Sequence, residues 1–202
     1  MATAEADIPT ASGVAHATID RSQSASFLLL MTHGAGGGVE TADLLAVRDA
    51  AVARGGAVAR IVQPYRVRGA RAPGAPGPQD AAWLEVVAVL RQEIPGVPLL
   101  LGGRSNGARV ACRTARQADA TGVIALAFPL HPPGRPEQSR VAELHGAGAP
   151  VLVVNGELDP FGIPAAGDAA RVVVLPGETH SLSRHPRDVG AAVGSWLDYL
   201  VG

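Results

Sequence analysis

Ser105 is the residue of this chain whose surroundings best fit nucleophilic chemistry. It stands at the centre of Gly103–Gly107, which reads Gly-Arg-Ser-Asn-Gly, directly after the apolar run 97–101 and before a small-residue helical pattern. This order predicts a tight strand-to-helix turn that strains the serine backbone, with glycines two positions to either side because larger side chains have no room. Because a helix opens at Ser105, the backbone N–H of Asn106 is expected to face an oxyanion.

A serine nucleophile needs a base to take its proton and an acid to orient that base. Asp159 follows the apolar run 151–154, and His180 follows the run 172–175. Both positions fit the carboxyl ends of strands. We therefore predict Ser105 as the nucleophile, His180 as the base and Asp159 as the acid.

Other residues compete for these two roles. Asp159 also fits an Asx turn before Pro160. The rival acids are Glu157 and Glu178, and the rival bases are His131, His145 and His185. His185 precedes Pro186 and fits the turn into a last helix, so we expect it at the surface.

A second glycine-rich segment, His33–Gly38, follows the apolar run 26–32. Backbone N–H groups in such a segment can bind an oxyanion, and we expect the N–H of Ala35 to join that of Asn106. A dinucleotide fingerprint is disfavoured because it needs glycine or alanine where Val39 stands. His33 is expected to be structural rather than a second base, and it is also a candidate for contact with substrate.

The segment 64–78 is rich in proline, glycine and arginine and is expected to form a long loop, followed by a helix capped by Asp80. Arg66, Arg68 and Arg71 are candidates for binding a carboxylate or phosphate of a substrate, because guanidinium groups suit both. The alternative is a solvated basic loop.

All 17 basic residues among the 202 are arginines. The absence of lysine excludes a Walker A loop, a protein-kinase site, a Ser-Lys dyad and a Schiff-base enzyme. A net charge of −1 and an aromatic content of 3% disfavour nucleic acid as a partner and favour a small-molecule acyl substrate. The single cysteine, Cys112, is expected to pack inside, and no spacing fits a metal site, so we expect neither metal nor cofactor.

The first residues lack a basic and an apolar region of a signal peptide, and no apolar run is long enough to cross a bilayer. We therefore expect a cytoplasmic protein without a membrane partner; the sequence leaves its oligomeric state open. We expect residues 1–13 to be disordered and residues 14–202 to form a single domain. Apolar runs alternate with helical patterns, which predicts an α/β fold, a doubly wound and mostly parallel sheet of about six or seven strands with little or no lid.

Four motifs carry a resemblance to a known family: His-Gly-Ala-Gly-Gly from residue 33, Gly-Gly-Arg-Ser-Asn-Gly from 102, Asn-Gly-Glu-Leu-Asp-Pro from 155 and Gly-Glu-Thr-His-Ser from 177. Together they resemble the compact α/β-hydrolase family related to dienelactone hydrolases. They also resemble the small hydrolase-like domains of testis-expressed proteins and of a regulatory subunit of a histone acetyltransferase complex. The resemblance covers residues 26–200 and implies an α/β-hydrolase fold with Ser105, Asp159 and His180 as the catalytic triad. Dienelactone hydrolases carry cysteine where this chain has Ser105, so their lactone chemistry is not implied.

These observations favour a serine hydrolase that cleaves an ester or thioester of a small acyl compound through an acyl-enzyme on Ser105. An amidase or peptidase would use the same triad. A binding or scaffold module of the same fold, without catalysis, is the alternative from a different class.

Overall fold

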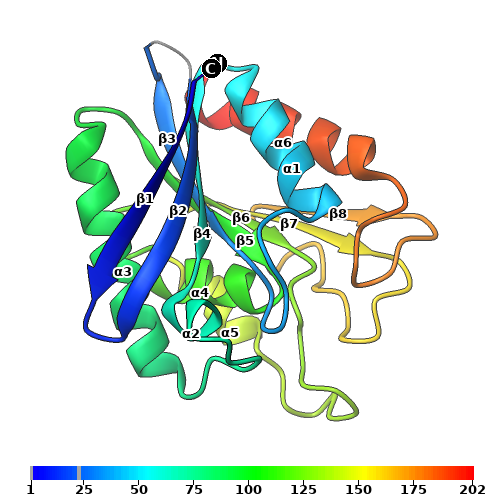
Figure 1. Cartoon of the computed structure of the whole chain (residues 1–202). Coiled ribbons are helices and arrows are strands. Elements are labelled where there is room, and N and C mark those ends of the chain that lie inside the picture. The colour runs from blue at the N-terminus through cyan, green and yellow to red at the C-terminus, as the bar shows by residue number, and fades with distance from the viewer. Residues whose placement is uncertain (1, 22–23) are drawn as a thin grey trace.

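The computed structural model describes residues 2–21 and 24–202. It contains a sheet of eight strands with helices on both faces (Figure 1), in the order β1-β2-β4-β3-β5-β6-β7-β8. The strands from β4 to β8 along this order are parallel, whereas β2 is antiparallel to both β1 and β4. The prediction of a mostly parallel sheet is confirmed, with one strand more than the upper number expected.

From the third strand onward, at least one helix lies between consecutive strands, except before the last strand. The strands are β1 (Ala2–Thr10), β2 (Gly13–Arg21), β3 (Phe27–Thr32), β4 (Gly56–Val62), β5 (Leu99–Arg104), β6 (Gly122–Leu126), β7 (Val151–Gly156) and β8 (Arg171–Leu175). The helices are α1 (Ala42–Val52), α2 (Pro64–Val67), α3 (Pro76–Glu93), α4 (Asn106–Thr114), α5 (Val141–His145) and α6 (Pro186–Val201). Within the described ranges, no separate lid domain interrupts this alternation.

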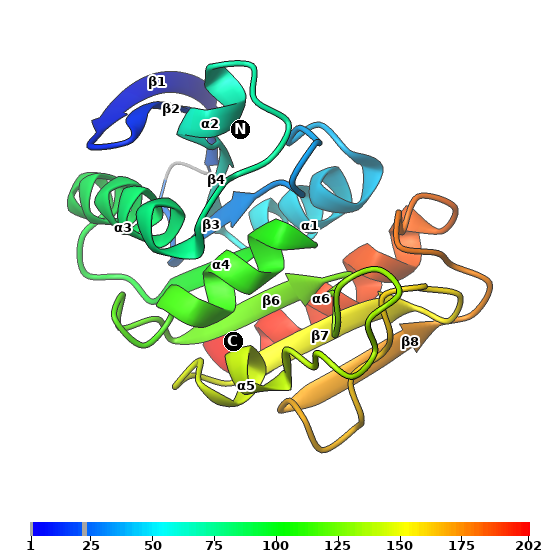
Figure 2. The same ribbon diagram turned by 90° about the horizontal axis from the view of Figure 1, so that it is seen from below.

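The helices form two layers around the sheet. Helices α1 and α6 cover one face, and α3, α4 and α5 cover the other (Figure 2). Strands β3, β6 and β7 are buried along their whole length because helices lie on both sides of them. Two apolar cores result, one on each face, and the carboxyl ends of the parallel strands meet at one edge of the sheet.

The N-terminal segment corrects one expectation. Residues 1–13 were expected to be disordered, but β1 pairs with β2 along its full length, from Ala2 opposite Arg21 to Thr10 opposite Gly13; Met1 lies outside the described residues. Ile8 packs into the core, while most other β1 residues are exposed and polar or small. An edge strand with one buried face shows little apolar patterning, and its stability comes from pairing with a strand later in the chain.

The segment 64–78 also differs from the expected loop. Its first residues form α2, and α3 begins at Pro76 rather than at a cap on Asp80. Proline fits the first turn of a helix, where its missing N–H has no intrahelical partner. The Asp80 carboxylate instead binds the guanidinium of Arg113 at 2.6 and 2.8 Å.

None of the helices in the described part of the chain is both long and apolar enough to traverse a bilayer.

Candidate active site

Ser105 occupies the turn between β5 and α4 with φ 54° and ψ −113°, a conformation that residues with side chains rarely adopt. Its backbone N–H donates to the carbonyl of Leu126 at 2.9 Å. A Cβ on Gly103 would lie 2.6 Å from the carbonyl carbon of Gly107, and a Cβ on Gly107 would lie 2.5 Å from the carbonyl oxygen of Thr32. Any side chain at either position would push the turn away from β3, which is why the pattern requires glycine at both.

The structure brings Ser105, His180 and Asp159 into one chain of hydrogen bonds. His180 Nε2 lies 2.9 Å from Ser105 Oγ, and His180 Nδ1 lies 2.8 Å from Asp159 Oδ2. These residues come from the turn after β5, the loop after β7 and the loop after β8, so three distant parts of the sequence converge at the carboxyl edge of the sheet. This arrangement allows the imidazole to accept the serine proton while the carboxylate orients the ring.

Asp159 is fixed by more than its histidine. Its side chain is fully buried, and Oδ1 accepts the backbone N–H of Phe161 at 2.9 Å. This bond is an Asx turn, so the alternative interpretation of Asp159 holds together with the contact to His180. Asn155 Nδ2 lies 3.4 Å from Asp159 Oδ2 and also donates to the carbonyl of Phe128 at 3.1 Å. Sequence reasoning missed Asn155, although a polar residue ending the buried strand β7 was a usable signal.

Phe161 packs its ring against the imidazole of His180. The two ring centroids lie 4.4 Å apart with an interplanar angle of 62°, an edge-to-face contact. Phe161 was not a candidate from sequence because a single aromatic residue in a loop carries no pattern. Its contact limits the rotation of the His180 ring from the side of the Asp159 loop.

The rival acids and bases have other partners. Glu157 is exposed and accepts the backbone N–H of Gly177 at 2.9 Å, whereas Glu178 is buried and accepts that of His185. His145 is exposed and lies 3.3 Å from a carboxylate oxygen of Asp168. His131 bonds through Nδ1 to the carbonyl of Pro132 at 2.9 Å, and His185 is exposed at the start of α6, as expected.

His33 is fully buried, which corrects its candidacy for contact with substrate. Its Nδ1 donates to the carbonyl of Gly34 at 2.8 Å, and its Nε2 accepts the backbone N–H of Gln63 at 3.0 Å. Burial lowers the pKa of His33 below its usual value of 6.5, and the positive charge of Arg66 acts in the same direction. His33 is therefore a neutral structural residue that joins the loop after β3 to the end of β4.

The loop His33–Gly38 lies beside the nucleophile. A Cβ built on Gly34 would be 3.3 Å from Ser105 Cβ. Helix α2 holds this loop by two carbonyls: Tyr65 Oη donates to Ala35 O at 2.8 Å, and Arg66 Nε donates to Gly37 O at 3.1 Å. Burial raises the pKa of Tyr65 to about 12, so its hydroxyl keeps the proton that it donates. Sequence reasoning missed Tyr65 because only the fold places α2 against the loop.

The three candidate arginines have different surroundings. Arg66 binds backbone carbonyls of Gly37 and Ala70, and Arg68 binds that of Ser12. Both side chains hold loops in this structure, and their contact with a substrate stays a prediction. Arg71 is exposed, and its carbonyl lies 3.8 Å from the position of a Cβ on Gly36.

Two further residues bear on the chemistry of the site. Cys112 is fully buried in α4, as expected, and burial raises the pKa of its thiol, so a thiolate nucleophile is disfavoured there. Asn106, directly after the nucleophile, has a buried side-chain nitrogen without a hydrogen-bond partner. Among the described residues, no group of three or more His, Cys, Asp or Glu side chains is arranged to hold a metal ion.

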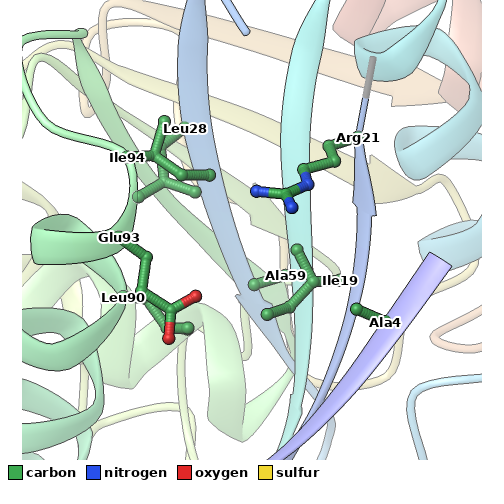
Figure 3. A pocket seen from close by; sticks show the side chains of 8 residues that line it. All are labelled: Ala4, Ile19, Arg21, Leu28, Ala59, Leu90, Glu93 and Ile94. Atoms are coloured by element: carbon green, nitrogen blue, oxygen red, sulfur yellow. The ribbon is translucent and has the colours of Figure 1, made fainter. Parts of the chain in front are cut away.

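A small cavity lies away from the triad, near the amino end of β3 (Figure 3). Arg21 from β2 and Glu93 from α3 stand on opposite sides of it, above a floor that includes Leu28 and Ala59. Its volume is about 50 Å³, whereas ligand sites commonly measure several hundred. This gap between the N-terminal hairpin and α3 is too small to be a substrate site.

A family model described as an alpha/beta hydrolase domain matches residues 25–188, which include Ser105, Asp159 and His180. The chain belongs to the alpha/beta hydrolase domain family. The fold expected from the sequence resemblance is thereby confirmed. No curated protein sequence matches the chain significantly.

Several solved structures have the same fold and match nearly the whole chain. A lidless α/β serine hydrolase from Xanthomonas campestris is 19% identical, with a TM-score of 0.81 over 98% of this chain and 95% of that chain. Est1E from Butyrivibrio proteoclasticus is 17% identical, with a TM-score of 0.80 over 98% of each chain. An α/β serine hydrolase homologue from Coxiella burnetii is 16% identical, with a TM-score of 0.79 over 98% of each chain. These similarities show the α/β-hydrolase fold over nearly the whole chain.

Proposed function

We propose that this α/β hydrolase cleaves an ester or thioester of a small acyl compound through an acyl-enzyme on Ser105. The observation that carries the proposal is the unbroken chain of hydrogen bonds from Ser105 Oγ through the His180 ring to Asp159, at 2.9 and 2.8 Å. A binding module has no need for a strained serine aligned with a buried acid and its histidine, so this geometry favours catalysis over the scaffold alternative.

In the proposed reaction, Ser105 Oγ attacks the acyl carbonyl while His180 Nε2 takes the serine proton. The Asp159 carboxylate stabilises the resulting imidazolium and holds its Nδ1–H. The imidazolium then protonates the departing alcohol or thiol, which leaves an ester of Ser105. Water, deprotonated by His180, attacks this ester, and collapse of the second tetrahedral intermediate releases the acid and restores the serine.

The backbone N–H groups of Asn106 and Ala35 are the proposed donors to the oxyanion of each tetrahedral intermediate. Asn106 begins α4, where free N–H groups point out of the helix. Ala35 belongs to the loop that packs beside Ser105 and is held by Tyr65. Removal of one such donor in other hydrolases costs about 10²–10³ in kcat.

The decisive test is labelling of the purified protein with a fluorophosphonate and hydrolysis of p-nitrophenyl acetate. Both activities are expected in the wild type and lost in Ser105→Ala. Ser195→Ala is the matched control, because Ser195 is exposed on α6 and bonds only to a surface arginine in the described structure. Labelling that persists in Ser105→Ala would reject the proposal.

The substrate class follows from the lack of a lid domain over residues 2–21 and 24–202. An open site buries little of a long acyl chain, so rates are expected to fall from acetyl and butyryl to decanoyl esters. Methyl ferulate belongs in the same panel, since Est1E has been solved with ferulic acid bound. Anilide analogues of the best ester test the amidase alternative.

Arg71 remains our candidate for binding a carboxylate of the substrate. Arg71→Ala is expected to raise KM for succinyl esters and to leave KM for acetyl esters unchanged.

A further inference from the structure

Arg104, the residue directly before Ser105, connects three separate parts of the active site. Its Nη2 donates to the carbonyl of His180 at 2.9 Å. Its Nε lies 3.0 Å from Oδ2 of Asp43, in the first turn of α1. Its Nη1 is 3.6 Å from the position that a Cβ on Gly34 would occupy. One side chain therefore contacts the histidine loop and α1, and it lies close to the loop after β3.

The pairing of Arg104 with Asp43 is expensive to bury. The Asp43 side chain is fully buried and that of Arg104 is 17% exposed. The 3.0 Å contact between Arg104 Nε and Asp43 Oδ2 is an ion pair without hydrogen-bond geometry, and burial raises the pKa of this carboxyl although Thr41 and the guanidinium act to lower it. Buried ion pairs often stabilise a fold no better than apolar residues of the same volume. Stability alone is therefore a poor account of a charged pair next to the nucleophile.

The bond to His180 supplies a better account. His180 must reach Ser105 on one side and Asp159 on the other, and its ring position depends on where the loop after β8 carries its backbone. Arg104 is the last residue of β5, and its side chain donates a hydrogen bond to the backbone carbonyl of His180. Asp43 lies beside Nε while Nη2 donates to His180, so its negative charge helps to hold the guanidinium in place.

We propose that Arg104 is a positioning residue for hydrolysis, which Asp43 orients so that it holds the His180 backbone where the ring reaches Ser105. This inference rests on the proposed function and extends it to a residue that touches no reacting atom. The role favours arginine because a guanidinium can donate from Nη2 to His180 while its Nε pairs with Asp43, whereas a lysine ammonium is a single point on a flexible stem.

The experiment compares Arg104→Met with Arg113→Met. Arg113 is the matched control. Its side chain is 16% exposed, and from the carboxyl-terminal part of α4 it pairs with Asp80 of α3. Both variants are expected to lower the melting temperature. Only Arg104→Met is expected to lower kcat on p-nitrophenyl acetate, by about 10²-fold, since misplacement by an ångström has an effect of that size. KM is expected to stay close to the wild-type value, as for an interaction that matters in the transition state.

Arg104→Lys and Asp43→Asn complete the series. Arg104→Lys keeps the charge and one donor, so it should recover part of the kcat lost in Arg104→Met. Asp43→Asn should lose less than Arg104→Met because the bond from Arg104 to His180 can remain. If Arg104→Met does not fold, these two variants carry the test. A kcat equal to that of Arg113→Met in every folded Arg104 and Asp43 variant would overturn the proposal.

A proton NMR measurement separates this inference from the proposed function. The Nδ1–H of His180, bonded to Asp159, should give a low-field resonance that is assigned by its loss in His180→Ala. We expect the resonance in the wild type and in Arg113→Met, and a shifted or exchange-broadened one in Arg104→Met. An unchanged resonance overturns the positioning role. A wild type that shows the resonance but hydrolyses and labels with nothing would reject the proposed function alone.

Discussion

The loops on either side of Ser105 are held by different kinds of interaction. The loop 33–38 after β3 is fixed by neutral hydrogen bonds around the uncharged, buried His33 and by donors from α2 to its carbonyls. The loop 176–185 after β8 is fixed at His180 by groups that carry charge, Asp159 on the ring and Arg104 on the backbone. The proposed electrophilic half of the site is therefore held through its backbone carbonyls and a neutral ring, with Arg66 as a charged donor, whereas in the basic half a carboxylate bonds the ring of His180 itself.

This difference suits what each loop has to do. Backbone N–H groups that face an oxyanion act best when they are preorganised and do not move during the reaction. In the proposed reaction His180, in contrast, gains and loses a proton in each half-reaction, so a buried carboxylate next to it would stabilise the charged intermediate. Substitutions in the two loops should therefore fail in different ways.

The largest effect is expected from His180→Ala. Loss of the base should lower kcat by about 10⁴-fold or more, with the fold intact, because the remaining site retains only binding and oxyanion stabilisation. Steady-state kinetics with p-nitrophenyl acetate measure the loss. His145→Ala is the control, since His145 is exposed and pairs with Asp168 away from the triad. Equal losses in both variants would contradict the assignment of the base.

Gly34→Ala tests how closely the loop 33–38 must approach Ser105. The new methyl would lie 3.3 Å from Ser105 Cβ and 3.6 Å from Arg104 Nη1, so the loop must shift away from the oxyanion position. We expect kcat to fall by about 10- to 100-fold.

Gly38→Ala is the matched control in the same loop, because a Cβ there would meet nothing within 4 Å. The comparison uses kcat per labelled active site, which separates a slower site from a smaller folded fraction. Equal activity of the two alanine variants would show that close packing against Ser105 does not matter.

Tyr65→Phe removes a single neutral bond to the loop, the one from Oη to Ala35 O at 2.8 Å. A neutral hydrogen bond contributes about 1 kcal/mol, so kcat should fall by about fivefold. Tyr199→Phe is the control because Tyr199 is 75% exposed at the end of the chain. A fall in stability with unchanged kcat would place Tyr65 in the scaffold and not in loop positioning.

The smallest effect concerns the pH dependence of stability. The pKa of His33 is lowered in the folded state from 6.5, so between the folded and unfolded values the unfolded chain binds more protons. The contribution of His33 is present above pH 6.5 and is lost as the pH falls toward the folded pKa, by at most about 1.4 kcal/mol for each pH unit.

Urea unfolding at pH 7.5 and 5.5 tests this linkage. His33→Gln should show a smaller loss of unfolding free energy between the two pH values than the wild type. His145→Gln, at an exposed position, should keep the wild-type difference. The same pH dependence in all three proteins would mean that protonation of His33 is not linked to folding.

Much of the architecture was readable from local patterns. The apolar runs that became β3, β5, β6 and β7 mark strands covered on both faces, and the glycines around Ser105 mark a turn whose crowding is local. The N-terminal strand β1 escaped prediction because only Ile8 is buried, with Ala6 and Thr10 half-buried on the same face, and its partner lies later in the chain. The boundary of α3 was misplaced because Asp80 fits a cap in sequence but forms an ion pair in space.

The sequence by itself determined which residues have the chemistry for a hydrolase and in which loops they stand. Apolar runs mark the ends of the strands, and glycine spacing marks the turn at Ser105. Only the tertiary structure decided which partners they choose. Glu178 stands two residues from His180, yet the ring bonds Asp159, 21 residues away. His33 is buried and accepts the backbone N–H of Gln63. Arg66 donates to the carbonyl of Gly37, and Arg104 donates to the carbonyl of His180. Such choices depend on distances between elements that are far apart in sequence, and hydrogen bonds form or fail within a few tenths of an ångström.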